Sequence, residues 1–105
     1  MRRLVAELPE AEERETWGHP TFRVRGKIFA GMAEDGRTAT VKATLAEQQA
    51  LVGSDPGTFG VASHVGRFGW VRVRLDRVDE EEMRELVTEA WRATAPKRLA
   101  AQLAD

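Results

Sequence analysis

Residues 17–30 read WGHPTFRVRGKIFA, and this stretch has the pattern of a β-hairpin. Apolar Phe22 and Val24 alternate with two arginines, which is typical of a strand with one buried side and one solvated side. Gly26 supplies the turn, because glycine adopts positive φ without steric cost. The return strand is predicted over residues 28–33.

The same alternation continues farther along the chain. Further strands are predicted over residues 38–43, 58–63 and 70–75. The last of these is the clearest, since Val71 and Val73 alternate with arginines. A one-residue slip would bury every cation, so we expect the apolar side of each strand to face the core. We therefore expect Val24, Val71, Val73 and Leu75 to be buried, and Arg23, Arg25, Arg72 and Arg74 to be exposed.

Helices are predicted before and between these strands. Residues 1–8 suit a short helix that ends at Pro9, because proline disfavours a helical residue before it. Thr44 and Glu47 have the spacing of a capping box, in which side chain and backbone of the two residues bond reciprocally. A second helix is therefore predicted to start at this point.

A third and longer helix is predicted after Asp79, which is a favourable N-cap residue. Pro96 limits this helix at its other end. It carries one continuous apolar stripe at helical spacing, formed by Met83, Leu86, Val87, Ala90, Trp91 and Thr94. Trp91 is therefore predicted to anchor the core.

These elements predict an α+β fold in one domain over residues 1–105. Its antiparallel sheet has helices packed on one face, and the other face is open. At 105 residues, with 42% apolar and 31% charged residues, the chain has the length and composition of a globular domain.

Several functional classes are excluded or disfavoured by composition. The absence of cysteine excludes disulfides, thiolate zinc sites and a cysteine nucleophile. No apolar run is long enough for a signal peptide or a membrane span, so we expect a cytoplasmic chain without a membrane partner. His19 and His64 lie far apart in sequence and lack the spacing of a metal motif. We therefore expect no metal site. We also expect no other cofactor, no catalytic residue and a monomeric protein.

The distribution of charge is more informative than the net charge of −1. Residues 10–15 are mostly acidic and are expected to form a solvated loop or a helical turn. No acid lies within a predicted strand, whereas five cations are expected on the open side of the sheet. They are Arg23, Arg25, Lys42, Arg72 and Arg74.

Two interpretations of this basic face stay open at this point. A positive face can steer an anionic partner even when the total charge is near zero. Alternatively, arginine stems simply cover the polar side of an ordinary sheet. Trp17 and Trp70 are equally open, since either can cover a sheet edge or stack on a flat ligand.

The chain resembles the MmcQ/YjbR family of small bacterial proteins. The resemblance runs through ELPEAEERETWGHPTFRVRGKIFA (residues 7–30) and GRFGWVRVRLDRVDEEEMRELVTEAWRATAPKRL (residues 66–99). Its most specific parts are the sequences LP at the end of the first helix, GHP before Phe22, GK and FA in the hairpin, GWV at the start of the last strand, and the closing APKRL. The resemblance implies a CyaY-like α+β fold, and members are commonly described as DNA-binding, without an established enzymatic activity.

The sequence therefore predicts a non-enzymatic binding protein. DNA is the favoured partner, bound weakly through the five cations of the open face, with Trp17 as an additional stacking residue. The alternative is a protein–protein adaptor that uses the same face against an acidic protein surface. A small-ligand or enzymatic role is the third hypothesis.

Overall fold

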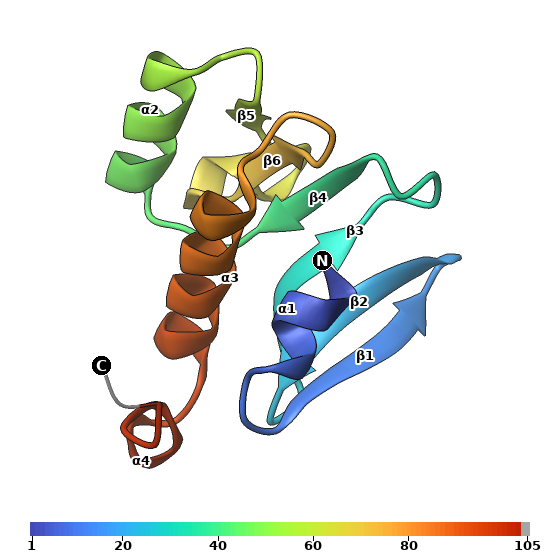
Figure 1. Ribbon diagram of the computed structural model, residues 1–105, viewed down its shortest axis with the longest axis vertical. Helices are drawn as coiled ribbons and strands as arrows, with labels where there is room; N and C mark the ends of the chain where they lie inside the picture. Colours follow the sequence, from blue (N-terminus) through green and yellow to red (C-terminus); the bar gives the residue numbers. More distant parts are fainter. Residues whose placement is uncertain (104–105) are drawn as a thin grey trace.

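The computed structural model describes residues 1–103 and contains one six-stranded antiparallel sheet over that range (Figure 1). The strand order is β1-β2-β3-β4-β6-β5. The strands are β1 (Ala11–Thr16), β2 (His19–Val24), β3 (Lys27–Met32), β4 (Thr38–Val41), β5 (Phe59–Val61) and β6 (Val71–Arg74). The predicted α+β fold with an antiparallel sheet is confirmed.

The helices lie on one face and at one edge of this sheet. In Figure 1, α1 and α3 lie on the same face, and α2 lies beside β5. Their bounds are α1 (Arg2–Ala6), α2 (Leu45–Ser54), the 3-10 turn η1 (Val65–Phe68), α3 (Glu80–Thr94) and α4 (Lys97–Ala100). None of the helices in residues 1–103 combines the length and the apolar character that crossing a membrane requires.

The predicted helix starts are confirmed in detail. The Thr44 hydroxyl accepts a hydrogen bond from the Glu47 amide at 3.1 Å, and Glu47 accepts one from the Thr44 amide at 3.0 Å. Asp79 accepts bonds from the amides of Glu81 and Glu82. These bonds satisfy amides that the first helical turn leaves without an intrahelical partner.

The prediction for residues 10–15 is wrong, because they form the edge strand β1. Trp17 and Gly18 join β1 to β2 in a two-residue turn with φ of 54° and 84°. Positive φ at both turn positions is the geometry that matches the twist of a hairpin. Charged side chains are common on edge strands, where they discourage pairing with another chain, and they hide the apolar alternation that identifies inner strands.

A bulge in β3 determines which side chains enter the core. Phe22 pairs with Ala30, but Arg23 pairs with Ile28, so Phe29 has no partner in the ladder. Phe29 and Ala30 are both fully buried, whereas Ile28 is partly exposed beside Arg23. The extra residue thus turns two successive side chains toward the helices.

Burial along the strands follows the predicted alternation in most places. Val24, Val71 and Val73 are fully buried, and Arg72 and Arg74 are exposed. Two positions differ: Leu75 lies beyond the end of β6 and is only partly buried, and Arg23 is half-buried rather than exposed.

Replacing Trp91 with alanine is expected to lower the free energy of unfolding by about 3–5 kcal/mol. Trp91 is fully buried, and its indole Nε1 donates to the carbonyl oxygen of Pro9 at 3.0 Å. Trp17→Ala is the control, because Trp17 is 92% exposed and its loss is expected to change stability by less than about 0.5 kcal/mol. Urea titrations followed by circular dichroism measure both changes, and a loss below about 1 kcal/mol for Trp91→Ala would contradict its role in the core.

Candidate functional site

The open face of the sheet is the side opposite α1 and α3. Because directly paired residues of antiparallel strands share a face, the register identifies its side chains. The pairs Thr21–Gly31, Gly31–Thr40 and Thr40–Arg72 form one row across four strands. The open face comprises Glu12, Arg14, Thr16, His19, Thr21, Arg23, Ile28, Gly31, Thr38, Thr40, Gly60, Arg72 and Arg74.

Arg72 and Arg74 form a pair of cations on one strand of the open face. They lie two residues apart on β6 and are both exposed. A Cβ at Gly60, the partner of Arg72 on β5, would lie 2.5 Å from a guanidinium nitrogen of Arg72, so this guanidinium lies over the glycine. Arg74 makes one long contact with Asp76, at 3.5 Å in an exposed setting, which contributes little neutralisation.

Arg23 is held more firmly at the other side of the same face. Its guanidinium donates to the hydroxyls of Thr16 at 3.2 Å and Thr21 at 3.4 Å. Glu12 lies directly opposite Arg23 on β1 and pairs with Arg14 at 3.3 Å. The strand β1, which was not predicted, brings Glu12 onto the open face and three acids into the sheet.

Arg25 does not contribute a free charge to this face. It lies in the β2–β3 turn with φ of 51° and donates two hydrogen bonds to Glu10, at 2.5 and 3.0 Å. These bonds lower the pKa of the Glu10 carboxyl and raise the pKa of Arg25. The predicted site residue Arg25 is thus paired with an acid that sequence spacing did not connect to it.

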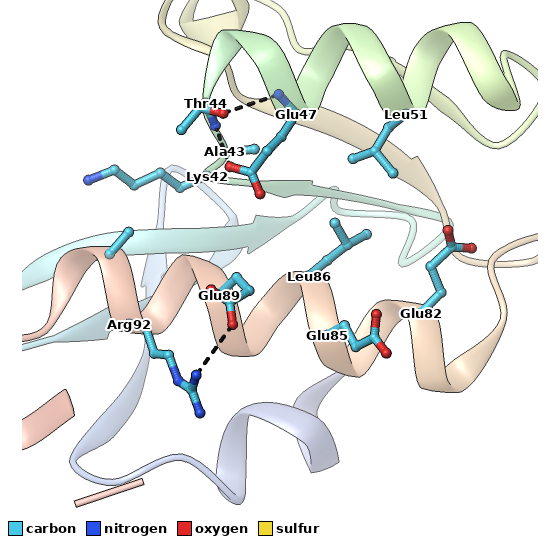
Figure 2. Close-up of a pocket in the computed structure, with 11 residues that line it drawn as sticks. Lys42, Ala43, Thr44, Glu47, Leu51, Glu82, Glu85, Leu86, Glu89 and Arg92 are labelled. Atoms are coloured by element: carbon cyan, nitrogen blue, oxygen red, sulfur yellow. Dashed lines mark hydrogen bonds and ion pairs between the residues drawn. The ribbon is translucent and has the colours of Figure 1, made fainter. Parts of the chain in front are cut away.

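Lys42 lies apart from the arginines as well. It follows the end of β4 and lines a groove of about 510 Å³ between α2 and α3 (Figure 2). The other charged groups in the lining of this groove are Glu47, Glu82, Glu85, Glu89 and Arg92. Glu89 and Arg92 form an ion pair at 3.6 Å. Lys42 therefore belongs to an acidic groove on the helical side, and Arg23, Arg72 and Arg74 are the predicted cations that share the open face.

A cavity of about 490 Å³ occupies the middle of the open face, and sequence reasoning missed it. Gly31 lies between Thr21 and Thr40 in the same row, so the centre of the face carries only short side chains. The β5–β6 connection forms one wall with Trp70 and His64, and His19 lines the cavity from β2. Trp70 thus lines a cavity instead of covering a sheet edge. Trp17 lies outside this lining, at the tip of the β1–β2 turn.

The backbone at His64 is strained. Its φ of 63° and ψ of −56° match the rare γ-turn form with positive φ, and the Val65 amide donates to the Ser63 carbonyl at 2.6 Å across it. The β5–β6 connection that contains His64 is also held by α2, because the Gln48 side chain donates to the carbonyls of Gly66 and Trp70 at 2.7 and 2.8 Å. His19 and His64 lie far apart in the sequence, but both line the cavity on the open face. Within residues 1–103 no cluster of three or more His, Cys, Asp or Glu side chains suits a metal ion.

Comparison with known proteins agrees with this architecture. The YjbR family model matches residues 6–93. Uncharacterised proteins of Mycobacterium bovis and Mycobacterium tuberculosis are 38% identical over 50 residues, which cover 48% of this chain and 39% of each relative's own length. The crystal structure of Deinococcus radiodurans protein DR2400, with a DUF419 domain, has a TM-score of 0.80 at 22% identity. The match covers 88% of this chain and 73% of that one, and it establishes a shared fold.

Glu10→Gln is expected to lower stability at neutral pH but not in acid. The lowered pKa of Glu10 means that its contribution is present above the pKa of the unfolded chain and is lost as pH falls through the folded value. Urea titrations at pH 7 and pH 3 test this, with the exposed Glu15→Gln on β1 as the control that stays at wild-type stability. An equal deficit for Glu10→Gln at both pH values would contradict the ion pair with Arg25.

The substitution His64→Gly is expected to leave the stability of the protein unchanged or to raise it. Relief of positive-φ strain is worth about 1–3 kcal/mol, whereas the added freedom of the unfolded chain costs about 0.4–1 kcal/mol. The neighbouring Ser63→Gly relieves no such strain and is expected to lose about 0.4–1 kcal/mol. Thermal unfolding of both variants tests the γ-turn, which a clear destabilisation by His64→Gly alone would contradict.

Proposed function

The chain belongs to the YjbR family, and we propose that it is a non-enzymatic protein that binds nucleic acid through the open sheet face. The observation that carries this proposal is the grouping of Arg23, Arg72 and Arg74 on one face. Guanidinium groups form planar, two-pronged hydrogen bonds that match phosphate oxygens. Exposed guanidinium groups on β6 are available for such contacts.

The two sides of the molecule differ in charge. Within residues 1–103, the open face holds four arginines and a single acid, Glu12. The groove between α2 and α3, by contrast, is lined by four glutamates together with Lys42 and Arg92 (Figure 2). A polarised charge distribution orients an approaching polyanion toward the arginine side, although the net charge of the chain is only −1.

The expected binding is weak and tolerant of sequence. Major-groove reading usually requires an inserted helix or ribbon that reaches base edges. The open face is a sheet surface flanked by α2, and its arginines are suited to backbone phosphates. Phosphate contacts release counterions, so affinity is expected to fall steeply as salt is added.

The non-enzymatic part of the proposal is supported by the composition of the open-face cavity. Among the described residues, its lining includes His19, His64 and Ser63 but neither a carboxylate nor a cysteine. A serine–histidine pair normally relies on a third group that orients the histidine. The cavity lining therefore has hydrogen-bonding groups but no carboxylate that would orient a histidine.

The double variant Arg72→Glu with Arg74→Glu is expected to abolish DNA binding at low salt while the fold stays intact. Both side chains are exposed, so charge reversal changes the surface without disturbing the core. Lys97→Glu with Arg98→Glu is the matched control, because it reverses two exposed cations on α4. Fluorescence anisotropy with labelled DNA measures binding, and circular dichroism checks folding.

Full binding by the folded Arg72→Glu, Arg74→Glu protein would exclude the open face as the site. Loss of binding in the control as well would indicate a response to net charge alone. If the wild-type protein binds no DNA at low salt, an acidic protein surface becomes the favoured partner of the same arginines.

A further inference from the structure

We propose that the cavity on the open face accepts one unstacked nucleobase, so that the protein prefers single-stranded over duplex nucleic acid. This inference rests on the proposed function and specifies its ligand. It adds a second kind of contact to the phosphate contacts of the arginines, one that depends on shape and stacking.

The volume of the cavity is that of a small-ligand site. Its volume of about 490 Å³ lies within the usual range of small-ligand pockets, about 300–1,000 Å³. The floor is shallow at Gly31, where the absence of a side chain leaves room between Thr21 and Thr40. A Cβ at Gly31 would lie 3.3 Å from the Pro20 carbonyl oxygen, so the two backbones approach closely at this point.

The lining has the chemistry that a heterocyclic base requires. The indole of Trp70 offers an aromatic surface, and the imidazoles of His19 and His64 each offer a donor and an acceptor. Hydroxyls of Thr38, Thr40 and Ser63 can both donate and accept hydrogen bonds. Over the described part of the chain the lining contains no Asp, Glu, Lys or Arg, so a neutral ring suits the interior better than a bare anion.

The strand positions of two arginines adjoin the cavity on two sides. Arg72 pairs directly with Thr40, and Arg23 lies two residues from Thr21 on the same face of β2. A strand that inserts one base between them brings its flanking phosphates toward these guanidinium groups. Bases within a duplex are paired and stacked, so this arrangement is open only to a single strand or to a base turned out of the helix.

The strained turn at His64 supports a ligand site at the same place. A non-glycine residue in this conformation persists only where the surrounding structure imposes it, and such residues cluster at binding sites. Here the γ-turn holds His64 in the cavity wall, and Gln48 anchors the connection behind it. The wall is thereby preorganised, which lowers the entropic cost of binding.

The decisive experiment compares two oligonucleotides that share a backbone. One is an octamer of deoxyadenylate, and the other is an abasic octamer with the same phosphates and no bases. We expect the wild-type protein to bind the octamer with bases about tenfold more tightly in an anisotropy titration, since stacking of a single base contributes a factor of that order. A hairpin duplex of equal charge is expected to bind like the abasic octamer.

Two variants assign this difference to the cavity. Thr40→Phe fills the cavity from the central strand, and Trp70→Leu removes its aromatic wall; each is expected to abolish the tenfold difference and to retain binding of the abasic octamer. Val61→Phe is the matched control, because it adds the same ring at an exposed position of β5 outside the lining. It is expected to keep the difference. By contrast, Arg72→Glu with Arg74→Glu weakens binding of both octamers.

The outcomes separate this inference from the proposed function. Equal affinity of the wild-type protein for the two octamers, or a tenfold difference that survives in folded Thr40→Phe and Trp70→Leu, overturns the base site while phosphate binding stands. If neither octamer binds, the proposed function fails, and titration with adenosine monophosphate decides the cavity alone. Amide NMR shifts at Thr40 and His64 would then support the base site, and their absence at millimolar ligand would overturn it.

Discussion

The register between β4 and β6 is the constraint on which the two faces of the molecule depend. Ala39 and Val41 lie opposite Val73 and Val71 and are buried together with Trp91. The alternate pairs join Thr38 to Arg74 and Thr40 to Arg72 on the open side. A slip of one residue would exchange these sets and bury two guanidinium groups, so the apolar pairs hold the arginines in solvent.

The same alternation that builds the core also creates the hollow in the open face. Along the row of Thr21, Gly31 and Thr40 the side chains lie on the face away from α3, and they are small. The bulge at Phe29 shifts the pairing of β2 and β3 by one residue, so Ile28 lies opposite Arg23 on the open face. Core packing and the shape of the candidate site are therefore consequences of one strand register.

Periodicity predicted the elements whose burial is one-sided, namely the hairpin after Phe22, β6 and the stripe of α3. It failed for β1, because an edge strand of charged residues shows no apolar alternation. The candidate site was predicted in part: Arg23, Arg72 and Arg74 share a face, but Arg25 is paired with Glu10 and Lys42 lies by α2. Those two outcomes, and the cavity that joins His19 to His64, depend on contacts between distant segments, which local spacing does not encode.

Electrostatics alone gives this face limited affinity for a polyanion. Glu12 lies opposite Arg23 and Glu10 occupies Arg25, so Arg72 and Arg74 are the predicted cations best placed to displace a counterion. Binding through phosphate contacts alone is the part of the binding free energy that added salt removes. Useful affinity then requires a contact that is independent of charge. The cavity beside Trp70 is the part of the open face whose shape and chemistry can supply one.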